Sequence, residues 1–368
     1  MKQITLNIKT KDKDYPIIIG KNLFNNLKRV FDRHLINFDK CLIIIDHKID
    51  KKAINKILNS IKKKNIEISF FKSNEKNKNQ KSVNKILDIL LKKNFNRNDC
   101  LISVGGGITG DVCGFAASIF KRGLKFINIP TTLLAQVDSS IGGKTGVNTI
   151  YGKNLLGSFY QPNLVISDIN FLKTLPRREI VCGYAEILKH ALIYNKKFFN
   201  FLNLNFLNII KLKSPFIEKA IYESCKIKKN IVQKDEKEKN LRKILNFGHT
   251  FAHAYEATMK YSKKLNHGEA VILGIGSALR FSLQKKLIKK NEFNLIQNHI
   301  LKSNLPYDLK KNFKKIHIKK ILSFMIKDKK NQSEKINLIL LKKIGLTDFK
   351  KEFKAKDIYI FLKKELNY

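Results

Sequence analysis

The first half of the chain alternates short apolar runs with amphipathic stretches. Strands are predicted where apolar residues run together or alternate with polar ones, at residues 4–8, 15–19, 41–45, 66–71, 101–104 and 126–129. Helical spacing is found at residues 22–34, 51–63 and 82–93, and again after the glycines that follow residue 104. Strands that alternate with helices favour a largely parallel sheet, so residues 1–175 are predicted to form an α/β domain.

The pattern changes beyond residue 176. Apolar residues now recur at helical spacing in five long stretches, at residues 177–195, 215–234, 248–259, 269–285 and 290–301. The charged run from Lys234 to Asn240 is interpreted as a solvated surface loop. Residues 176–368 are therefore predicted to form a second, mainly α-helical domain.

Three adjacent glycines follow the strand predicted at residues 101–104. Gly105, Gly107 and Gly110 fit the pattern G-x-G-x-x-G, in which backbone N–H groups approach a phosphate closely at the start of a helix. This predicts a Rossmann-like dinucleotide site, although the usual acidic residue about 20 positions further on is absent. A tight turn without a ligand remains an alternative. Asp46, at the end of an earlier strand, could hold a ribose hydroxyl or cap a helix.

A second run rich in glycine, serine and threonine extends from Asp138 to Thr145 and contains Lys144. Its chemistry is that of a phosphate-binding loop, although it lacks the Walker A spacing. Lys144 and Lys153 each follow a glycine, and we expect both to lie in turns where the backbone comes close to a ligand. In a chain this rich in lysine, both could equally be ordinary surface residues.

One carboxylate and several imidazoles occur in the predicted helices of the second half. Glu186 and Lys189 are three residues apart and share a helix face. His249 and His253 are four residues apart, and His267 begins the next helix. One glutamate with two histidines is a ligand set typical of a catalytic Zn²⁺ site that keeps one position open. The alternative is that these histidines are buried or cap helices.

Composition adds expectations about partners and location. The net charge is +43, yet only eight of the 73 basic residues are arginine, the residue that best contacts nucleic-acid bases and phosphates. Lysine is spread along the whole chain, so we expect a solvated surface and no nucleic-acid partner. There is no apolar run long enough to span a membrane, no signal-peptide pattern and no CxxC pair among five cysteines. We therefore expect a cytoplasmic protein with no membrane partner and with buried, reduced cysteines.

Seven motifs, taken in order, resemble those of the 3-dehydroquinate synthase family. The resemblance extends from about residue 15 to residue 345, and the motifs are GGGITGD, IPTTLLAQVDSSIGGKTGVN, GKNLLGSFYQP, LKTLP, GYAEILKHALI, NFGHTFAHAYE and HGEAV. It implies a dehydroquinate synthase-like fold with an NAD-binding α/β domain and a helical metal- and substrate-binding domain. It also implies a homodimer that uses NAD and Zn²⁺ or Co²⁺. The implied reaction converts 3-deoxy-D-arabino-heptulosonate 7-phosphate, a phosphorylated seven-carbon sugar acid, to 3-dehydroquinate and phosphate in the shikimate pathway.

The resemblance also implies roles for individual residues. The implied metal ligands are Glu186, His249 and His267. The implied NAD contacts are Gly107, Ile108, Thr109, Gly110, Asp111, Thr131, Thr132, Lys144, Lys153, Phe171, Leu172, Lys173 and Thr174, together with Gly105 and Gly106 of the glycine turn. Substrate hydroxyls and carboxylate would be held by Asp138, Lys189, Lys228, Arg242 and Asn246. The substrate phosphate would be surrounded by Asn154, His253 and Lys329, and Arg122 would reach the site of the partner subunit.

One segment departs from the family pattern. Where the family often has Asp-Gly-Glu-x-x-Lys near the adenosine, this chain has the sequence SNEKNK at residues 73–78. Glu75 and Lys78 remain in register and are implied to contact NAD, whereas the aspartate and the glycine are absent. Two other functions also stay open. Metal-dependent polyol dehydrogenases share the two-domain layout but release NADH, and related cyclases act on other sugar phosphates.

Overall fold

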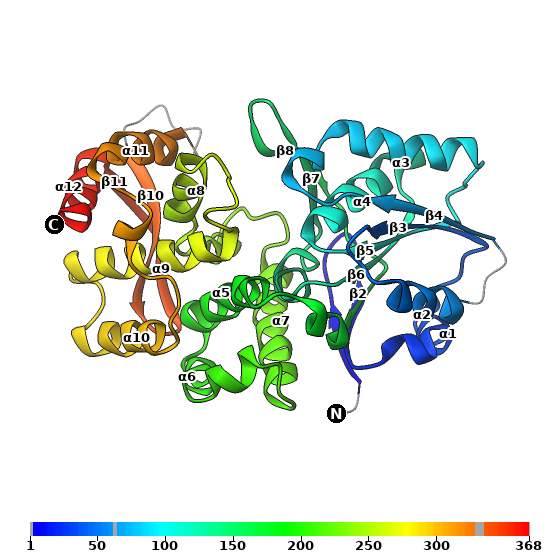
Figure 1. Cartoon of the computed structure of the whole chain (residues 1–368), viewed down its shortest axis with the longest axis horizontal. Helices are drawn as coiled ribbons and strands as arrows, with labels where there is room; N and C mark the ends of the chain where they lie inside the picture. The colour runs from blue at the N-terminus through cyan, green and yellow to red at the C-terminus, as the bar shows by residue number, and fades with distance from the viewer. Residues whose placement is uncertain (1–2, 62–64, 328–334, 368) are drawn as a thin grey trace. The chain divides into compact units, whose positions relative to one another are not determined.

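The computed structural model describes residues 3–61, 65–327 and 335–367, and the chain divides into two compact units (Figure 1). The first unit is Met1–Pro176 together with Lys228–Lys237, and the second is Arg177–Ile227 together with Glu238–Tyr368. The ten residues 228–237 therefore belong to the first unit, although they follow much of the second in the sequence.

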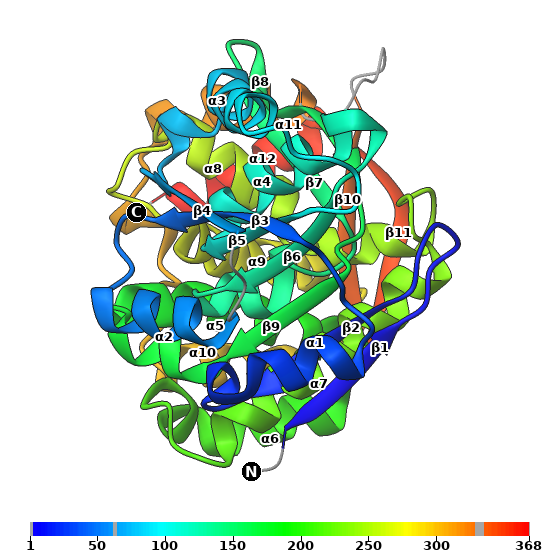
Figure 2. The same cartoon turned by 90° about the vertical axis from the view of Figure 1, so that its right-hand side faces the viewer.

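A seven-stranded sheet forms the centre of the first unit (Figure 2). Among the described strands its order is β1-β2-β9-β6-β5-β3-β4, and every pairing is parallel except that of β1 with β2. The strands are β1 (Ile4–Ile8), β2 (Tyr15–Gly20), β3 (Lys40–Asp46), β4 (Asn65–Phe71), β5 (Cys100–Gly105), β6 (Lys125–Pro130) and β9 (Leu164–Asp168). The predicted α/β fold with a largely parallel sheet is confirmed, and β9 is a strand that the sequence pattern did not predict.

Helices cover both faces of this sheet (Figure 2). On one face, α1 (Leu27–Arg33) and α2 (Lys51–Ile61) pack over Ile43 and Ile45 of β3. On the other, α3 (Gln80–Lys92) and α4 (Gly107–Ile119) pack over Leu42 and Ile44. Successive side chains of a strand point to opposite faces, and burial on both faces explains the uninterrupted apolar run of β3. The helix predicted at residues 22–34 is divided into a 3₁₀ turn, η1 (Leu23–Asn26), and α1.

The glycine-rich turns expected around Lys144 and Lys153 are instead two strands. They are β7 (Lys144–Thr149) and β8 (Gly152–Phe159), which pair as an antiparallel hairpin. Gly146 lies opposite Gly157, where a Cβ atom would be 2.1 Å from the carbonyl oxygen of Thr145. These glycines therefore allow the two strands to approach each other closely. The sequence pattern indicated contact of the glycines in this region with a phosphate and did not predict the strand pairing. Several apolar side chains of the hairpin are exposed: Ile150, Tyr151, Leu155, Leu156 and Phe159.

The second unit is mainly helical, as predicted. Its helices are α5 (Arg177–Tyr194), α6 (Lys196–Ile210), α7 (Phe216–Lys234), α8 (His249–Thr258), α9 (His267–Gln284), α10 (Lys290–Lys302), α11 (Ile318–Lys327) and α12 (Ala355–Leu366). The last residues of α7, from Lys228 onward, belong to the first unit. A hairpin of β10 (Lys335–Lys343) and β11 (Leu346–Lys354) was not predicted. It packs on α9, where the ring of Phe281 lies 5.0 Å from Phe353 of β11 and 5.1 Å from Phe361 of α12.

The charged run from Lys234 to Asn240 is more than a solvated loop. Glu236 is buried, and its carboxylate accepts hydrogen bonds from the side chain of Gln161, at 2.7 Å, and from the backbone of Lys11, at 3.1 Å. The interpretation of this run as purely solvated is therefore wrong. A buried carboxylate needs such partners, and they fix this segment to the first unit.

Two expectations from composition can be compared with the structure. All five cysteines are unpaired and buried, as expected. Within the ranges that the structure describes, no helix combines the length and the apolar character needed to cross a membrane.

A buried histidine links three helices in the second unit. His299 of α10 is 1 % exposed, with Nε2 at 2.9 Å from the hydroxyl of Tyr184 and Nδ1 at 3.1 Å from Oδ1 of Asn203. The rings of Phe199 and Phe206 stand edge-on to the imidazole. Burial lowers the pKa of His299 to about 4, so its ring is neutral at pH 7.

We expect this histidine to make the protein sensitive to acid. Between about pH 6.5 and pH 4 the unfolded chain binds a proton at His299 that the folded chain does not. The stability contributed by the neutral ring is complete above pH 6.5 and is lost as the pH falls toward 4, by up to about 3 kcal/mol. In His299→Gln, urea unfolding at pH 7 and pH 4.5 should therefore show a smaller acid loss than in the unmodified protein. Equal losses in both proteins would contradict this.

Candidate active site

Three helices of the second unit bring together Glu186, His249 and His267. Glu186 lies in the middle of α5, while the two histidines are the first residues of α8 and α9. A Cβ atom at Gly268 would be 2.2 Å from Cα of Cys182 in α5. One at Gly274 would be 2.2 Å from the carbonyl oxygen of Gly248, the residue before α8. The two glycines therefore allow α9 to pack closely against both α5 and α8.

A capping box fixes where α9 begins. The side chain of Asn266 accepts the backbone N–H of Glu269 at 2.8 Å, and the carboxylate of Glu269 accepts that of Asn266 at 2.9 Å. This reciprocal pair satisfies two of the free N–H groups at the helix start. His267, the residue after the cap, is thereby held in a defined orientation.

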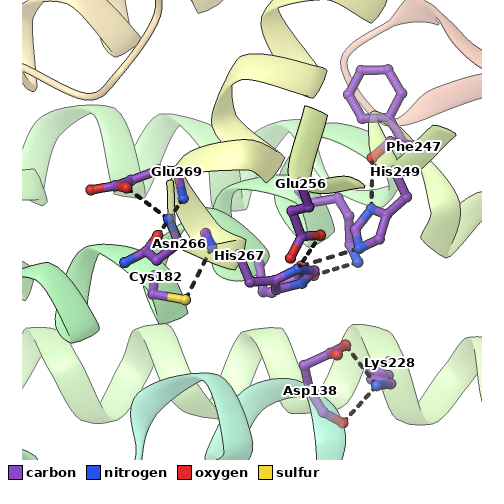
Figure 3. A network of polar contacts seen from close by, with 12 residues as sticks. Asp138, Cys182, Lys228, Phe247, His249, Glu256, Asn266, His267 and Glu269 are labelled. Carbon is purple, nitrogen blue, oxygen red and sulfur yellow. Dashed lines mark hydrogen bonds and ion pairs between the residues drawn. The ribbon is translucent and has the colours of Figure 1, made fainter. Parts of the chain in front are cut away.

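The ligand atoms of the three residues face one another. One from each residue lies within 4.8 Å of the others. Nε2 of His249 is 3.4 Å and Nε2 of His267 is 3.8 Å from Oε1 of Glu186. Figure 3 shows the imidazoles of His249 and His267 side by side. Glu186 and His249 are buried, whereas the side chain of His267 is 33 % exposed, so the cluster is accessible from one side.

The other nitrogen of each imidazole has a partner that orients the ring. Nδ1 of His249 lies 3.3 Å from the carbonyl oxygen of Phe247, and Nδ1 of His267 lies 3.2 Å from Oε2 of Glu256 (Figure 3). A ring that donates through Nδ1 keeps Nε2 as its acceptor, which is the form that binds a metal. The sequence motifs contain Glu256 but did not indicate this role. Its position two helical turns after His249 is the signal that could have done so.

The charges in this cluster favour ionised Glu186. Burial raises the pKa of the Glu186 carboxyl, but the charge of Lys189 and the hydrogen bonds to His249 and His267 outweigh burial and hold this pKa well below its usual range. The ammonium group of Lys189 contacts the carboxylate directly, one helical turn away. Burial and the charge of Lys189 lower the pKa of His249 to about 4. Burial would also lower the pKa of His267, but its hydrogen bonds to Glu186 and Glu256 raise it to about 10, so a metal ion that binds Nε2 would displace a proton from this ring.

One carboxylate and two Nε2 atoms that face it fit a divalent cation of the Zn²⁺ or Co²⁺ type. Zinc in catalytic sites commonly takes three protein ligands of these kinds and leaves a fourth position for water or substrate. The cluster in this chain has the donors, their orienting partners and an accessible side.

The residues predicted to contact NAD follow the carboxyl ends of four adjacent strands. Asp46 ends β3 and Gly105 ends β5, Thr131 follows β6, and the 3₁₀ segment η5 (Ile169–Thr174) follows β9. In open parallel sheets, ligands bind at this edge. The glycine turn also lies here, with Gly106 as the N-cap of α4. Position 105 needs a glycine for packing, since a Cβ atom there would be 2.5 Å from Oγ1 of Thr109.

Asp46 does not cap a helix. Its Oδ1 accepts the backbone N–H of Lys48 at 3.1 Å, which closes the turn after β3. The cap of α2 is Asp50, which accepts the backbone N–H of Ala53 at 2.9 Å. The helix-cap alternative for Asp46 is therefore wrong, and its contact with a ribose stays a prediction.

The predicted NAD residues differ in how much side chain they expose. Thr109, Phe171 and Leu172 are buried in the first unit, and Phe171 belongs to its hydrophobic core. Lys173 and Thr174 are exposed, and Gly106, Gly107, Ile108 and Thr132 are half-buried. Lys78 contacts Asp111 and Asn154, Lys153 contacts Glu75, and Asn148 connects the two groups.

The residues predicted to bind substrate occur in both units. In the first, Nζ of Lys228 donates to Oδ1 and to the backbone oxygen of Asp138, each at 2.6 Å (Figure 3). In the second, the ring of His253 stands 5.4 Å from that of His249, and Arg242 is buried. Lys144 and Arg122 are exposed. Lys329 lies outside the described residues.

Asn246 has a partner that sequence reasoning missed. Its side-chain amide donates to Oε1 of Glu238 at 2.9 Å. Glu238 belongs to the charged run interpreted as a solvated loop, and its backbone is left-handed, with φ 56°. A non-glycine residue in that conformation is uncommon and has no signal in the sequence pattern.

Comparisons with known proteins give this site its context. Residues 68–182 match the 3-dehydroquinate synthase N-terminal domain family, and residues 183–331 match the 3-dehydroquinate synthase C-terminal domain family. The 3-dehydroquinate synthase of Pelagibacter ubique (strain HTCC1062) is 61 % identical over 363 residues, which cover 99 % of both chains. This chain belongs to the 3-dehydroquinate synthase family. Its activity is a carbon–oxygen lyase reaction that forms 3-dehydroquinate and phosphate in the shikimate pathway.

Solved structures support the dehydroquinate synthase-like fold. A 2-deoxy-scyllo-inosose synthase complexed with carbaglucose-6-phosphate, NAD⁺ and Co²⁺ matches with a TM-score of 0.89 and 25 % identity, over 98 % of this chain and all of that one. The 2-epi-5-epi-valiolone synthase of Streptomyces hygroscopicus subsp. jinggangensis 5008, with NAD⁺ and Zn²⁺ bound, matches with a TM-score of 0.85 and 23 % identity, over 97 % and 98 % of the chains.

We expect Glu256 to control how tightly the cluster holds a metal. In Glu256→Gln the carboxylate that orients the ring of His267 loses its charge. Zn²⁺ affinity should therefore fall by about 10- to 100-fold. Calorimetric titration of the metal-free protein with Zn²⁺ measures this directly. Glu352→Gln, on the exposed surface of β11, is the matched control and should bind as the unmodified protein does. Equal affinity of the Glu256 variant would show that the carboxylate does not act on the site.

Proposed function

We propose that this chain performs the reaction with NAD and with a Zn²⁺ or Co²⁺ ion held by Glu186, His249 and His267. The cluster of one buried carboxylate and two oriented imidazoles, with ligand atoms within 4.8 Å of one another, carries this proposal. Support for NAD comes from the glycine turn at the carboxyl edge of the parallel sheet. The related cyclase complexed with NAD⁺ and Co²⁺ supports both cofactors.

The bound groups supply chemistry that side chains lack. When bound, NAD accepts a hydride from the substrate and returns it, while the cation acts as a Lewis acid on substrate hydroxyls. The protein's own residues bind and orient the substrate. Two ion pairs, Asp138 with Lys228 and Glu186 with Lys189, hold their polar atoms in place before the substrate arrives. Such preorganisation places charge where it is needed without reorganisation during the reaction.

The remaining predicted residues act on the two ends of the substrate. Arg242 and Asn246 hold its hydroxyls and carboxylate, and the amide of Asn246 is oriented by Glu238. Asn154, His253 and Lys329 surround the phosphate, which leaves by elimination. The two domains divide this work, with residues 1–175 binding NAD and residues 176–368 binding metal and substrate. Asp138 and Asn154, which lie in residues 1–175, and Lys228, which belongs to the first unit, are exceptions, because all three are proposed to bind the substrate.

A homodimer in the cytoplasm completes the proposal. Arg122 is exposed at the end of the 3₁₀ turn η3 (Phe120–Arg122), and Ile119 and Phe159 are exposed apolar side chains of α4 and β8. Ser118 and Ser158, their sequence neighbours, are hydrogen-bonded at 2.8 Å, so α4 and β8 are adjacent at this place. A second copy of the chain would cover Ile119 and Phe159 and receive Arg122 in its own site. Five unpaired cysteines fit a reducing compartment.

Phosphate release from 3-deoxy-D-arabino-heptulosonate 7-phosphate tests the proposed chemistry. We expect turnover that EDTA removes and that Zn²⁺ or Co²⁺ restores. Glu186→Ala and His267→Ala should each lower it below detection. Cys182→Ser should retain most activity, because a serine hydroxyl can still accept the N–H of Gly268, which Sγ accepts at 3.2 Å.

Two outcomes of the same assay would favour the alternatives. Turnover that survives chelation would exclude the metal assignment. Steady formation of NADH from NAD⁺ and a polyol would favour a dehydrogenase, and preference for a different sugar phosphate would favour a related cyclase.

Mixing two inactive variants tests the place of Arg122. Arg122→Ala and His267→Ala damage different components, so a mixed dimer in which Arg122 crosses to the partner has one intact site. Random exchange of subunits should then restore about a quarter of the unmodified activity. No recovery, with mixed dimers confirmed by mass spectrometry, would place Arg122 in its own subunit's site.

A further inference from the structure

We propose that Lys78 is a positioning residue, which acts through Asp111 of α4 and Asn154 of β8 by holding the two together. This extends the proposed function, since both partners are predicted to serve the reaction, Asp111 toward NAD and Asn154 toward the substrate phosphate. The resemblance to the family assigned Lys78 a direct contact with NAD. The geometry points to a role inside the protein instead.

The ammonium group of Lys78 lies between two side chains from distant parts of the sequence. Its Nζ donates to Oδ2 of Asp111 at 2.6 Å and to Oδ1 of Asn154 at 2.5 Å. The Lys78 side chain is 8 % exposed and that of Asp111 is 20 % exposed, so this ion pair is largely shielded from water, whereas Asn154 is exposed. Lysine has three donors, and two of them are committed to these partners. A buried cation with these bonds is a fixed crosslink between α4 and the β7–β8 hairpin.

Asn148 adds a second link between the hairpin and the segment that carries Lys78. Its backbone N–H donates to the carbonyl oxygen of Lys78 at 2.8 Å, and its side-chain amide donates to Oε2 of Glu75 at 2.8 Å. Its Oδ1 accepts the backbone N–H of Asn154 at 3.1 Å. Lys153 also reaches Glu75, at 3.4 Å. The tip of the hairpin is therefore tied to residues 75–78 by backbone and side-chain bonds together.

These bonds hold Asn154 in a conformation that it would otherwise seldom adopt. Its φ is 54°, in the left-handed region. Asparagine tolerates that region better than most residues, but it still requires support from its surroundings. Support comes from Lys78 at the side chain and from Asn148 at the backbone. Without Lys78, Asn154 would lose the contact that directs its side chain.

Asparagines shape the segment in which this chain departs from the family pattern. Asn74 accepts the backbone N–H of Asn77 at 2.9 Å at the start of η2 (Glu75–Asn77). Asn79 accepts that of Ser82 at 3.0 Å at the start of α3. The side chain of Asn77 donates to the carbonyl oxygen of Lys72 at 2.7 Å. These local bonds give the turn a defined shape without the aspartate and glycine of the family, and they place Lys78 beneath the hairpin.

Loss of the Lys78 charge would leave Asp111 in an unfavourable environment. Burial raises the pKa of the Asp111 carboxyl, and the nearby charge of Lys78 opposes that rise. Removing one partner of a shielded ion pair leaves the other charge uncompensated, so the remaining group shifts or rearranges. We therefore expect both partners of Lys78 to move when its ammonium group is absent.

Hydrogen exchange of the ligand-free protein tests this role without reference to catalysis. In Lys78→Met, backbone amides of residues 144–159 and of the first turn of α4 should exchange about tenfold faster than in the unmodified protein. Peptides from β3 and from α5 should be unchanged. Lys76→Met is the matched control, because Lys76 is exposed in the same turn and carries the same charge. If Lys78→Met does not fold, Asn148→Ala removes the second link at a half-exposed position and should accelerate exchange in residues 148–154.

Binding and kinetics then separate positioning from direct contact. We expect Lys78→Met to lower the affinity for NAD about tenfold and to raise the KM for the sugar phosphate, while the affinity for Zn²⁺ stays unchanged. Weaker NAD binding with unaltered exchange in the hairpin would mean that Lys78 contacts NAD directly, and the proposal would be wrong. Uniformly faster exchange throughout the first unit would also overturn it, as a general loss of stability. An inactive unmodified protein would instead refute the proposed function and leave the exchange result interpretable.

Discussion

The close packing of α9 against α5 and α8 is the constraint on which the site depends. Gly268 and Gly274 leave no room for a Cβ atom, and each faces backbone atoms of a neighbouring helix. Because backbone cannot yield as a flexible side chain can, these helices meet only with glycine at both positions. The three ligands sit at or beside these contacts. The distances between the three residues are thus set mainly by how closely the helix backbones pack.

Contacts around the three predicted ligands determine the orientation of the imidazole rings and the charge of the carboxylate. Phe247 and Glu256 hold the Nδ1 atoms, Lys189 opposes the charge of Glu186, and the capping box at Asn266 sets the start of α9. Each contact comes from a residue outside the predicted ligand set. A cluster with the same three ligands but without these neighbours would have rings free to rotate and a carboxylate without compensation. The chemistry therefore requires the surrounding helices as well as the ligands.

The sequence predicted six of the seven strands of the central sheet and most of the helices, because their apolar positions reflect burial that each segment expresses locally, whereas the interior strand β9 was missed. The strands of the β7–β8 hairpin were missed, since glycines at positions 146 and 157 resemble a loop unless the pairing of two backbones is known. Motif resemblance proposed the three metal ligands, and the structure brings them together. Glu256, Glu238 and Asn148 could not be identified in that way. Their importance lies in partners 11, 8 and 6 residues away or further, and only the folded chain shows which oxygen meets which nitrogen.

The asparagines at positions 74, 77 and 79 have a wider implication for a chain so rich in lysine and asparagine. A short amide side chain can supply from within the turn the bonds that a glycine-containing loop obtains from backbone freedom. Substitutions that introduce asparagine can therefore be accommodated at such turns while the buried lysine beneath keeps its place. The fold therefore tolerates changes of sequence in the connections between helices and strands better than at the close contacts between helices.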